Sequence, residues 1–466
     1  MSGRSVPGAA PARRHSGGSG SRDSYARLVE SGPAGFVASR LGLPRPIELR
    51  RHAADGPLIP GRVLVLGDTG RSAGILADLS AAGVLTSTSA EGWISGVIID
   101  AVSASRISAL DDVRSALHNT LTRLQASGRV VILGPVPDAV DPVNTESAAV
   151  AQALEGLVRS TAKELRKGAT ANLVQLGTGA DPWPAVRFLL SGGSAYVDGQ
   201  VLVVGAAASV QVAPEQPLDG RVAVVTGAAR GIGAAIVETL GRDGARVLCV
   251  DVPAAGQSLA AVANSVAGTA LHLDVTRADA GHRIAEAAAR LGGLDIVVHN
   301  AGITRDRLVV NMEPSKWAAV LEVNLAAQVR IDDILLAEGS PLASQARFVA
   351  VSSVSGIAGN RGQTNYAASK AGVIGAVRAR ARQFIDPDGC PHAGRTYNAV
   401  APGFIDTEMT ARMPFGPREL GRRLNSLSQA GLPVDVAEAV AFFARPDSGG
   451  VNGQVLRVCG QSILGR

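Results

Sequence analysis

Tyr366 and Lys370 lie one helical turn apart in the sequence N-Y-A-A-S-K-A-G, thirteen residues after Ser353. Side chains at positions i and i+4 share one face of a helix, so we expect the Lys370 ammonium beside the Tyr366 hydroxyl, where it favours the ionised phenol. A phenol ordinarily has a pKa of about 10. The spacing therefore predicts a lowered pKa that makes Tyr366 a usable acid or base near neutrality.

A glycine-rich turn lies upstream of these residues, in T-G-A-A-R-G-I-G at 226–233. It follows a predicted apolar strand at 221–226 and precedes a predicted helix, which is the context that a dinucleotide-binding turn requires. Gly227 would permit the tight turn, Gly231 would let the backbone approach a pyrophosphate, and Gly233 would allow close helix packing. The helix N-terminus would offer amide donors to the anion. Helix–sheet packing alone also selects glycine, so the turn by itself is a weak signal.

The next predicted strand, R-V-L-C-V-D, ends at Asp251. A carboxylate there would accept both ribose hydroxyls of a dinucleotide and repel a 2′-phosphate. Arg230 has the opposite tendency, because a guanidinium in the turn pairs with a 2′-phosphate. We give the repulsion more weight and expect NADH rather than NADPH. The alternative for Asp251 is a turn cap. Further on, Asp274 and Val275 could border the adenine, and N-A-G at 300–302 could close the pocket floor.

Composition argues against several other classes of protein. The 466-residue chain has 46% hydrophobic but only 3% aromatic residues, with 55 glycines, which is typical of tightly packed α/β layers. We find no run of about 18 uncharged apolar residues that would predict a membrane span. Cys249, Cys390 and Cys459 lack metal-ligand spacing and a disulfide pattern. We therefore predict a cytoplasmic protein without a bound metal or a membrane partner.

The net charge of +5 could suggest nucleic acid, but part of it comes from Arg4, Arg13, Arg14 and Arg22 near the start of the chain. Because no basic stripe interleaved with aromatics follows, we do not expect nucleic-acid binding. The segment 1–26 is rich in Gly, Ser, Pro and Ala and has no apolar h-region. It predicts a disordered tail rather than a secretory signal.

The chain repeats itself imperfectly when residues 61–206 are aligned with residues 220–460. The two segments share, in the same order, an opening G-R-V, an internal T-x-N and a closing G-Q-V-L, which begin at Gly61, Thr170 and Gly199 and again at Gly220, Thr396 and Gly453. Chance similarity between apolar segments is the alternative. The shared order and the polar positions favour two domains of one α/β class.

In this alignment the first half has lost the chemistry, because Ser147, Ala151 and Pro135 fall opposite the tyrosine, the lysine and the serine. Its opening strand runs into G-D-T-G-R-S-A-G, which lacks the glycine spacing of a phosphate turn. We predict a flavodoxin-like or degenerate Rossmann domain that serves as a packing partner. The predicted boundaries are a non-catalytic domain at 27–211, a Pro-containing linker at 212–219 and a catalytic domain at 220–466, with a Rossmann-type doubly wound parallel sheet.

With these motifs in hand, the segment from about 219 to 460 resembles the short-chain dehydrogenase/reductase family throughout its length. T-G-x-x-x-G-I-G, N-A-G, Ser353, Y-x-x-x-K and P-G-F-I-D-T at 402–407 occur in the family's order. Within the family it is similar to β-ketoacyl-ACP reductases. The two-part layout and G-R-R-L-N-S-L at 421–427 resemble the high-molecular-weight reductases of actinobacteria. The resemblance implies an NADH-preferring homodimer that reduces β-ketoacyl thioesters of CoA or acyl carrier protein. His299 departs from the family, which often carries Asn there.

The resemblance also implies roles for single residues. Tyr366 would give a proton to the developing alkoxide, Ser353 would hold the carbonyl oxygen, and Lys370 would stabilise tyrosinate and bind the nicotinamide ribose. Asn324 would hold a relay water, or else only pin a loop. Thr407 would donate to the cofactor, or else cap a helix. The predicted cofactor contacts are Gly227, Arg230, Gly231, Ile232, Gly233, Asp251, Asp274, Val275, Asn300, Ala301, Gly302, Tyr366, Lys370, Pro402, Gly403, Ile405 and Thr407.

Two other functions stay open at this point. One is a hydroxyacyl or secondary alcohol dehydrogenase of the same fold that works in oxidation. The other is a nucleotide-sensing scaffold without turnover, against which the intact Ser353, Tyr366 and Lys370 argue.

Residues 408–430 contain Met409, Met413 and Phe415 among Gly and Pro breaks. They predict either a mobile lid over an acyl chain or an amphipathic hairpin packed on the core. Three arginines in this segment would attract CoA phosphates or an acidic carrier protein, or would only face solvent; they are Arg418, Arg422 and Arg423. Members of the family pack as tetramers through the helices that carry the Tyr–Lys pair. If the first half takes one neighbour's place, two chains would mimic four domains, which predicts a homodimer.

Overall fold

The structure is a computed structural model that describes residues 46–67, 70–87, 92–137, 144–385, 394–411 and 413–462, together with Tyr25 and Arg40. Residues Glu48–Arg466 form one compact unit, and Met1–Ile47 are assigned to another. Apart from Tyr25, the predicted tail at 1–26 lies outside the described residues, as does Cys390. We call residues 48–204 the N-terminal half and residues 222–462 the C-terminal half. The described segment between them, 205–221, contains no helix or strand.

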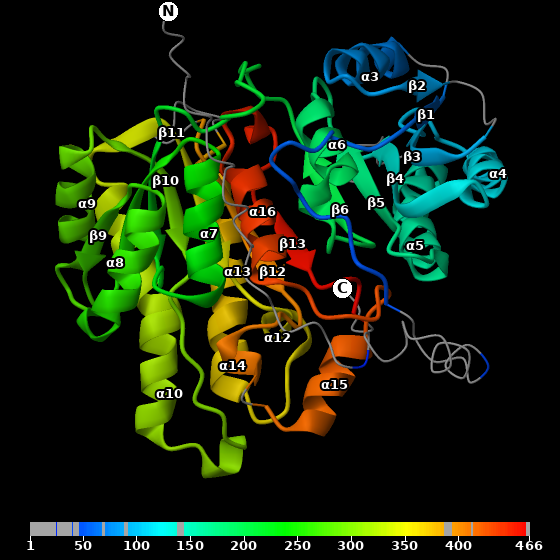
Figure 1. The fold of residues 1–466 in the computed structure, drawn as a ribbon. Helices are drawn as coiled ribbons and strands as arrows, with labels where there is room; N and C mark the ends of the chain where they lie inside the picture. Colours follow the sequence, from blue (N-terminus) through cyan, green and yellow to red (C-terminus); the bar gives the residue numbers. More distant parts are fainter. Residues whose placement is uncertain are drawn as a thin grey trace, which may run out of the picture. The chain divides into compact units, whose positions relative to one another are not determined.

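In the described residues, the N-terminal half contains a six-stranded parallel sheet with the order β2-β1-β3-β4-β5-β6 (Figure 1). This is the 2-1-3-4-5 order of flavodoxin-like folds with one further strand at its end. The strands are β1 (Val63–Leu66), β2 (Thr86–Ser87), β3 (Ile94–Asp100), β4 (Leu124–Pro135), β5 (Thr170–Leu176) and β6 (Val201–Val204). The helices are α3 (Gly70–Ala81), α4 (Ala109–Leu121), α5 (Thr145–Glu164) and α6 (Trp183–Leu190).

The C-terminal half contains a seven-stranded parallel sheet with the order β13-β12-β11-β10-β7-β8-β9. Numbered from β7, this is the Rossmann order 3-2-1-4-5-6 extended by a seventh strand, which confirms the predicted fold class. The strands are β7 (Val222–Thr226), β8 (Arg246–Asp251), β9 (Thr269–His272), β10 (Leu294–His299), β11 (Leu342–Val351), β12 (Thr396–Pro402) and β13 (Val455–Val458). The helices are α7 (Gly231–Arg242), α8 (Gly256–Ser265), α9 (Ala280–Arg290), α10 (Pro314–Leu321), α11 (Ala327–Leu335), α12 (Val354–Ala358), α13 (Thr364–Gln383), α14 (Glu408–Ala411), α15 (Phe415–Arg423) and α16 (Pro433–Ala444).

Successive side chains along the central strands point to opposite faces of the sheet, which divides the hydrophobic interior into separate cores. In β7, Val225 points into a core shared with α7, α8 and α16, whereas its neighbour Val224 points to the opposite face, against α9, α11 and α13. The first of these cores continues into the N-terminal half through α6 and α3. A third core lies on the other face of the first sheet, under α4 and α5. The two sheets therefore share one central layer of helices, which fixes the N-terminal half against the C-terminal half.

Equivalent elements of the two halves meet in this central layer. Phe188 of α6 and Phe442 of α16 stack with ring centroids 4.4 Å apart. Each lies twelve residues before the glutamine of its G-Q-V-L sequence. Gln200 accepts a hydrogen bond from Arg457 of β13 (3.2 Å), and Gln454 accepts one from the Val203 amide of β6 (3.3 Å). Because the contacts are reciprocal, the interface has approximate twofold symmetry, and the repeat seen in the sequence packs against itself.

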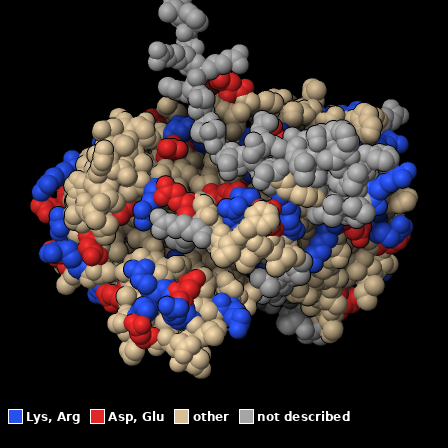
Figure 2. All heavy atoms as spheres, turned by 60° about the horizontal axis from the view of Figure 1, so that its bottom comes forward, with Lys and Arg blue, Asp and Glu red and all other residues tan. Residues whose placement is uncertain are grey.

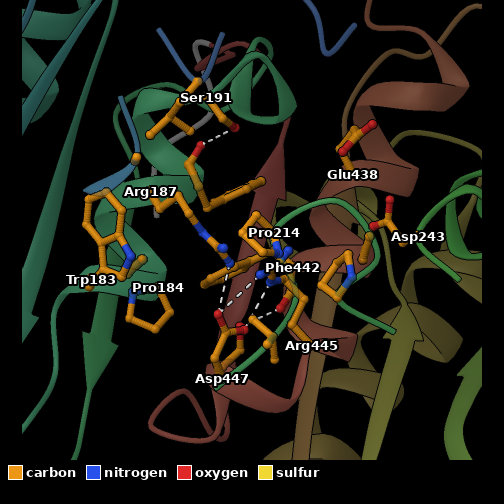
Figure 3. Close-up of a pocket in the computed structure, with 18 of the residues that line it drawn as sticks. Trp183, Pro184, Arg187, Ser191, Pro214, Asp243, Glu438, Phe442, Arg445 and Asp447 are labelled. Atoms are coloured by element: carbon orange, nitrogen blue, oxygen red, sulfur yellow. Dashed lines mark hydrogen bonds and ion pairs between the residues drawn. The ribbon is translucent and has the colours of Figure 1, made fainter. Parts of the chain in front are cut away.

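A cleft beside this interface is lined by α6, α16 and the connecting segment (Figure 3). Its charged side chains largely neutralise one another. Arg187 of α6 and Arg445 both point toward Asp447 and donate to its carboxylate (2.9 and 3.0 Å), and Arg242 pairs with Glu438 (2.5 Å). The cleft is therefore a junction held by ion pairs, and the chemistry of the sequence motifs lies elsewhere.

Candidate active site

The predicted catalytic residues gather at the carboxyl edge of the second sheet. Parallel strands end at the same edge, and in register His299 pairs with Ala350, and Val351 with Val400. Ser353 lies two residues after the end of β11 at this edge and caps α12, where its Oγ accepts the Ser355 amide (3.1 Å). The sheet thus brings the segments after β7, β10, β11 and β12 to one place.

Ser353 is the serine that meets Tyr366. A hydrogen bond between their side chains lowers the pKa of the phenol. The neighbouring Ser352 instead donates its hydroxyl to the Lys370 carbonyl (2.8 Å), and Ser355 directs its hydroxyl to Gln363 (3.4 Å). The hydroxyls of Ser352 and Ser355 thus have other partners, and Ser353 as the catalytic serine remains a prediction.

The expected lowering of the Tyr366 pKa is wrong for this structure. Burial of the phenol is the largest effect and raises the pKa above its ordinary value, and the hydrogen bond to Ser353 offsets this only in part. The Lys370 ammonium does lie close, with Nζ 5.8 Å from the centre of the tyrosine ring. However, it donates to the Val351 carbonyl (2.7 Å). Tyr366 is consequently held as a neutral phenol at neutral pH.

Lys370 is buried, with 4% of its surface exposed. Burial disfavours the charged ammonium and lowers its pKa to about 8. Gly302 of the N-A-G motif lies directly beside it: a Cβ atom there would lie 3.5 Å from Lys370 Nζ and 3.4 Å from Asn324 Oδ1. Gly302 therefore lies in contact distance of both the lysine and the asparagine.

Asn324 lies in a π-helical turn, η5 (Glu322–Ala326), between α10 and α11. Such turns re-aim a side chain and are frequent at functional sites. Its amide group accepts from the Ile303 amide (2.8 Å), donates to the Ile303 carbonyl (3.0 Å) and donates to Ser369 (3.0 Å). These bonds pin the loop after N-A-G, so the pinning role is present. A relay role for Asn324 remains a prediction.

The glycine turn has the geometry that a phosphate cradle needs. Gly227 and Gly231 have φ of 66° and 57°, a region that favours glycine. A Cβ atom on Gly233 would lie 1.9 Å from the Gly227 carbonyl oxygen and 2.6 Å from Asn300 Nδ2. Asn300 donates to the carbonyls of Thr226 and Gly227 (both 3.0 Å), which ties N-A-G to the turn. These contacts fix the backbone amides at the start of α7, where the N-terminus of a helix offers hydrogen-bond donors to a phosphate group.

Asp251 lies at the end of β8 beside this turn. Its Oδ2 accepts the Ala229 amide (2.9 Å) and its Oδ1 accepts the Val252 amide (2.8 Å), so the carboxylate does act as a cap. Each oxygen retains a second lone-pair direction for a ribose hydroxyl. Arg230 is exposed in the same turn. Both groups that were expected to read the ribose are therefore present.

The remaining predicted cofactor residues differ in accessibility. Val275 and Ile405 are buried in the core, so only their backbones are free to line a pocket. Asp274 accepts from Thr276 (2.8 Å), and Thr407 pairs with Thr410 at the start of α14, which is the capping arrangement. Gly403 is packed on Cys459, since a Cβ there would lie 2.5 Å from Cys459 Cβ. Ile232, Ala301 and Pro402 lie at the same edge of the sheet.

A buried polar network beneath the site was not found from the sequence. His299 Nε2 and Asp332 Oδ1 are 2.7 Å apart, and the other carboxylate oxygen accepts from Tyr397 (2.8 Å). Gln328 donates to the tyrosine oxygen (2.6 Å). The unusual histidine before N-A-G thus has a partner on α11, and the departure from the family pattern was the signal that pointed to it.

The segment 404–431, here called the lid segment, carries α14 and α15. Two of its three arginines are tied down: Arg422 is buried and pairs with Asp406 (2.8 Å) and Glu419 (2.9 Å), and Arg423 pairs with Glu419 (3.2 Å). Figure 2, which presents the face that holds this segment, shows basic and acidic side chains intermixed. Attraction of an acidic partner by these arginines gains no support from this arrangement. The side chain of Met409 lies outside the described residues.

The Rossmann strand order, the glycine turn and the Ser–Tyr–Lys group at one sheet edge are together typical of nucleotide-dependent oxidoreductases. A family model described as enoyl-(acyl carrier protein) reductase matches residues 227–460. The chain belongs to the short-chain dehydrogenase/reductase family.

Several characterised proteins are similar to this chain. It is 38% identical over 244 residues to a 3-oxoacyl-[acyl-carrier-protein] reductase of Vibrio cholerae, covering 52% of this chain and 97% of that protein. The corresponding reductase of Pseudomonas aeruginosa is 41% identical over 247 residues (52% and 97%). An acetoacetyl-CoA reductase of Synechocystis is 42% identical over 244 residues (52% and 96%). Within the described part of the chain, no helix combines the length and apolar character needed to span a bilayer.

Proposed function

We propose that the protein uses a nicotinamide dinucleotide to reduce β-ketoacyl thioesters of CoA or acyl carrier protein to β-hydroxyacyl thioesters. The observation that carries the proposal is the gathering of Ser353, Tyr366 and the buried Lys370 at one edge of the second sheet, with Lys370 Nζ 5.8 Å from the centre of the tyrosine ring. The substrate class follows from the relatives named as 3-oxoacyl-[acyl-carrier-protein] and acetoacetyl-CoA reductases.

The residues present fit a dinucleotide. Gly231 leaves the start of α7 clear for a pyrophosphate, since no atom lies within 4 Å of a Cβ built there, and Asp251 offers carboxylate oxygens to the ribose. Lys370 and Asn324 lie beside Gly302, where the nicotinamide end would be held. When bound, the cofactor supplies the hydride that the β-keto carbon accepts.

The chain itself handles the proton. Ser353 donates to the β-keto oxygen and holds it near Tyr366, which delivers the proton from its Oη as negative charge develops on that oxygen. The Lys370 ammonium stabilises the resulting tyrosinate electrostatically. Asn324 fixes the loop beside the lysine through its two hydrogen bonds to Ile303.

The alternative, oxidation by a dehydrogenase of the same fold, uses the same residues in reverse, because the phenolate left after reduction is the base that oxidation needs. Reduction is favoured by the relatives, which are named as 3-oxoacyl-[acyl-carrier-protein] and acetoacetyl-CoA reductases. A scaffold without turnover would not need this arrangement.

Replacing Tyr366 by Phe tests the proposal. In an assay of NADH or NADPH oxidation with acetoacetyl-CoA and a longer β-ketoacyl-CoA, the variant should lose on the order of a hundredfold or more in kcat. Dinucleotide binding should persist, because the ring stays in place. Ser352→Ala is the matched control, since its hydroxyl only donates to the Lys370 carbonyl. Near wild-type turnover in the Phe variant would remove the catalytic assignment.

We further propose NADH as the preferred cofactor, because the Asp251 carboxylate is fixed by two backbone amides at the position that a 2′-phosphate would approach. Asp251→Ala should shift the ratio of kcat/KM for NADH over NADPH toward NADPH by tenfold or more. Arg230→Ala, in the same turn, should shift it in the opposite direction. A wild-type enzyme that already favours NADPH would contradict the assignment.

We also propose a homodimer, supported by the twofold-like contact between the halves, in which the N-terminal half occupies one neighbour's place. A cytoplasmic location remains a prediction from the cysteine pattern.

A further inference from the structure

Tyr196 belongs to the N-terminal half but lies against the lid segment of the C-terminal half. It is fully buried. Its hydroxyl donates to the Gln429 carbonyl (2.7 Å), and its own carbonyl accepts the Gly460 amide (3.0 Å). The ring fills the space beside two glycines: a Cβ on Gly431 would lie 2.6 Å from Tyr196 Cδ1, and one on Gly460 would lie 2.8 Å from Cε2. The surroundings are therefore shaped to this side chain.

The residues that Tyr196 contacts close the base of the lid segment. Gly431 accepts the Asp406 amide (2.9 Å) and donates to the Phe404 carbonyl (3.0 Å), which joins the two ends of the segment. Those ends follow β12 at the carboxyl edge of the sheet, next in register to the strand that ends before Ser353. Movement at Gly431 would therefore shift α14 and α15 relative to the catalytic group.

A second contact from the N-terminal half reinforces this base. Gln461 donates to the Arg159 carbonyl of α5 (2.7 Å) and accepts from the Ser426 hydroxyl of the lid segment (2.8 Å). The Ser426 amide also donates to the Gly460 carbonyl (2.8 Å). Both attachments of the lid base thus reach back to the N-terminal half.

We propose that Tyr196 is a positioning residue: through it the N-terminal half holds the base of the lid segment and sets the affinity of the site for its thioester substrate. The inference rests on the proposed reductase function for its kinetic consequence. It gives the N-terminal half a part in substrate binding beyond packing, although that half lies outside the family match.

Tyr196→Phe in the full-length protein removes the single hydrogen bond and keeps the ring. We expect KM for acetoacetyl-CoA to rise about three- to tenfold, the effect of one lost hydrogen bond, with kcat within about twofold and the Kd for NADH unchanged. Arg187→Gln is the control, because it breaks an ion pair between the same two halves without touching the lid segment. An unchanged KM in the Phe variant, or an equal rise in the control, would overturn the proposal.

Limited trypsin digestion separates this inference from the proposed function. Arg418 and Arg423 lie in α15, and cleavage there should be several-fold faster in Tyr196→Phe than in wild type or Arg187→Gln. If wild type shows no reductase activity, the proposed function fails, and the digestion still decides whether Tyr196 holds the lid segment. Equal cleavage rates in the three proteins would refute the attachment.

Discussion

Tyr366 and Lys370 are the two titratable side chains of the catalytic group, and burial changes the pKa of both. It disfavours the charged form of each group, so it raises the pKa of the phenol and lowers that of the ammonium to about 8. The pKa of the phenol rises from 10.0 and that of the ammonium falls from 10.5, so the two values move apart. The phenol therefore holds its proton more tightly than the ammonium does, and Lys370 is the first of the two to lose its proton as the pH rises.

Lys370 should show this burial as a pH dependence of stability. Below pH 8 the folded protein bears the full cost of a buried charge. Between pH 8 and 10.5 the folded protein has lost the proton while the unfolded chain keeps it, so stability rises with pH, by roughly 3 kcal/mol in all. Lys370→Met should abolish both this rise and the reductase activity. Urea unfolding at pH 7.5 and 10 measures it, and a parallel pH dependence in the variant would contradict the burial argument.

The grouping of the three predicted catalytic residues could be predicted from the sequence, because Ser353, Tyr366 and Lys370 have fixed spacing along one helix and the strand before it. The direction of the Tyr366 pKa could not. It depends on how deeply the ring is buried and on the negative charge of Asp306, both of which raise the pKa. Neither quantity is a property of local sequence.

At the scale of elements, strands and turns followed the sequence closely: β8 spans the whole of the predicted strand R-V-L-C-V-D, and α7 begins within the glycine turn. Contacts between elements that are distant in the sequence could not be predicted from it. Asp332 of α11 links His299 of β10 to Tyr397 of β12, positions 33 and 65 residues away. Only the folded sheet brings these residues together. The unusual His299 could therefore be identified in the sequence, whereas its partner Asp332 could not.

Asp332 should therefore stabilise the second sheet. Asp332→Ala leaves His299 and the Tyr397 hydroxyl buried without their acceptor, and we expect the free energy of unfolding to fall by about 2–5 kcal/mol. The adjacent Asp333→Ala is the control, because that carboxylate is largely exposed and pairs only with Arg380 at the surface, worth less than about 1 kcal/mol. Urea denaturation of both variants measures this difference. An equal loss of unfolding free energy in the two variants would show that the buried network adds no stability.

At the scale of the whole molecule, we propose that the N-terminal half supplies contacts rather than chemistry. Its Asp100, at the end of β3, occupies the register position of Asn300, as shown by the pairing of Gly96 with Arg129 and of Ile296 with Arg347. A carboxylate there would repel a pyrophosphate, which supports the prediction that this half does not bind a dinucleotide. The N-terminal half retains helix α6 and strand β6, which form the twofold-like interface.

That interface covers α16, and we propose α13 as the face for a second chain. Small exposed residues follow one side of α13, namely Ala368, Ala371, Gly375 and Ala379, which permits close helix packing. Light scattering should give twice the chain mass of 47.4 kDa. Gly375→Arg should give the mass of one chain with an unchanged circular dichroism spectrum, because no atom lies within 4 Å of the added Cβ. Gly74→Arg on α3, equally open, should stay dimeric. A wild-type monomer would refute the idea that the N-terminal half replaces a neighbouring subunit.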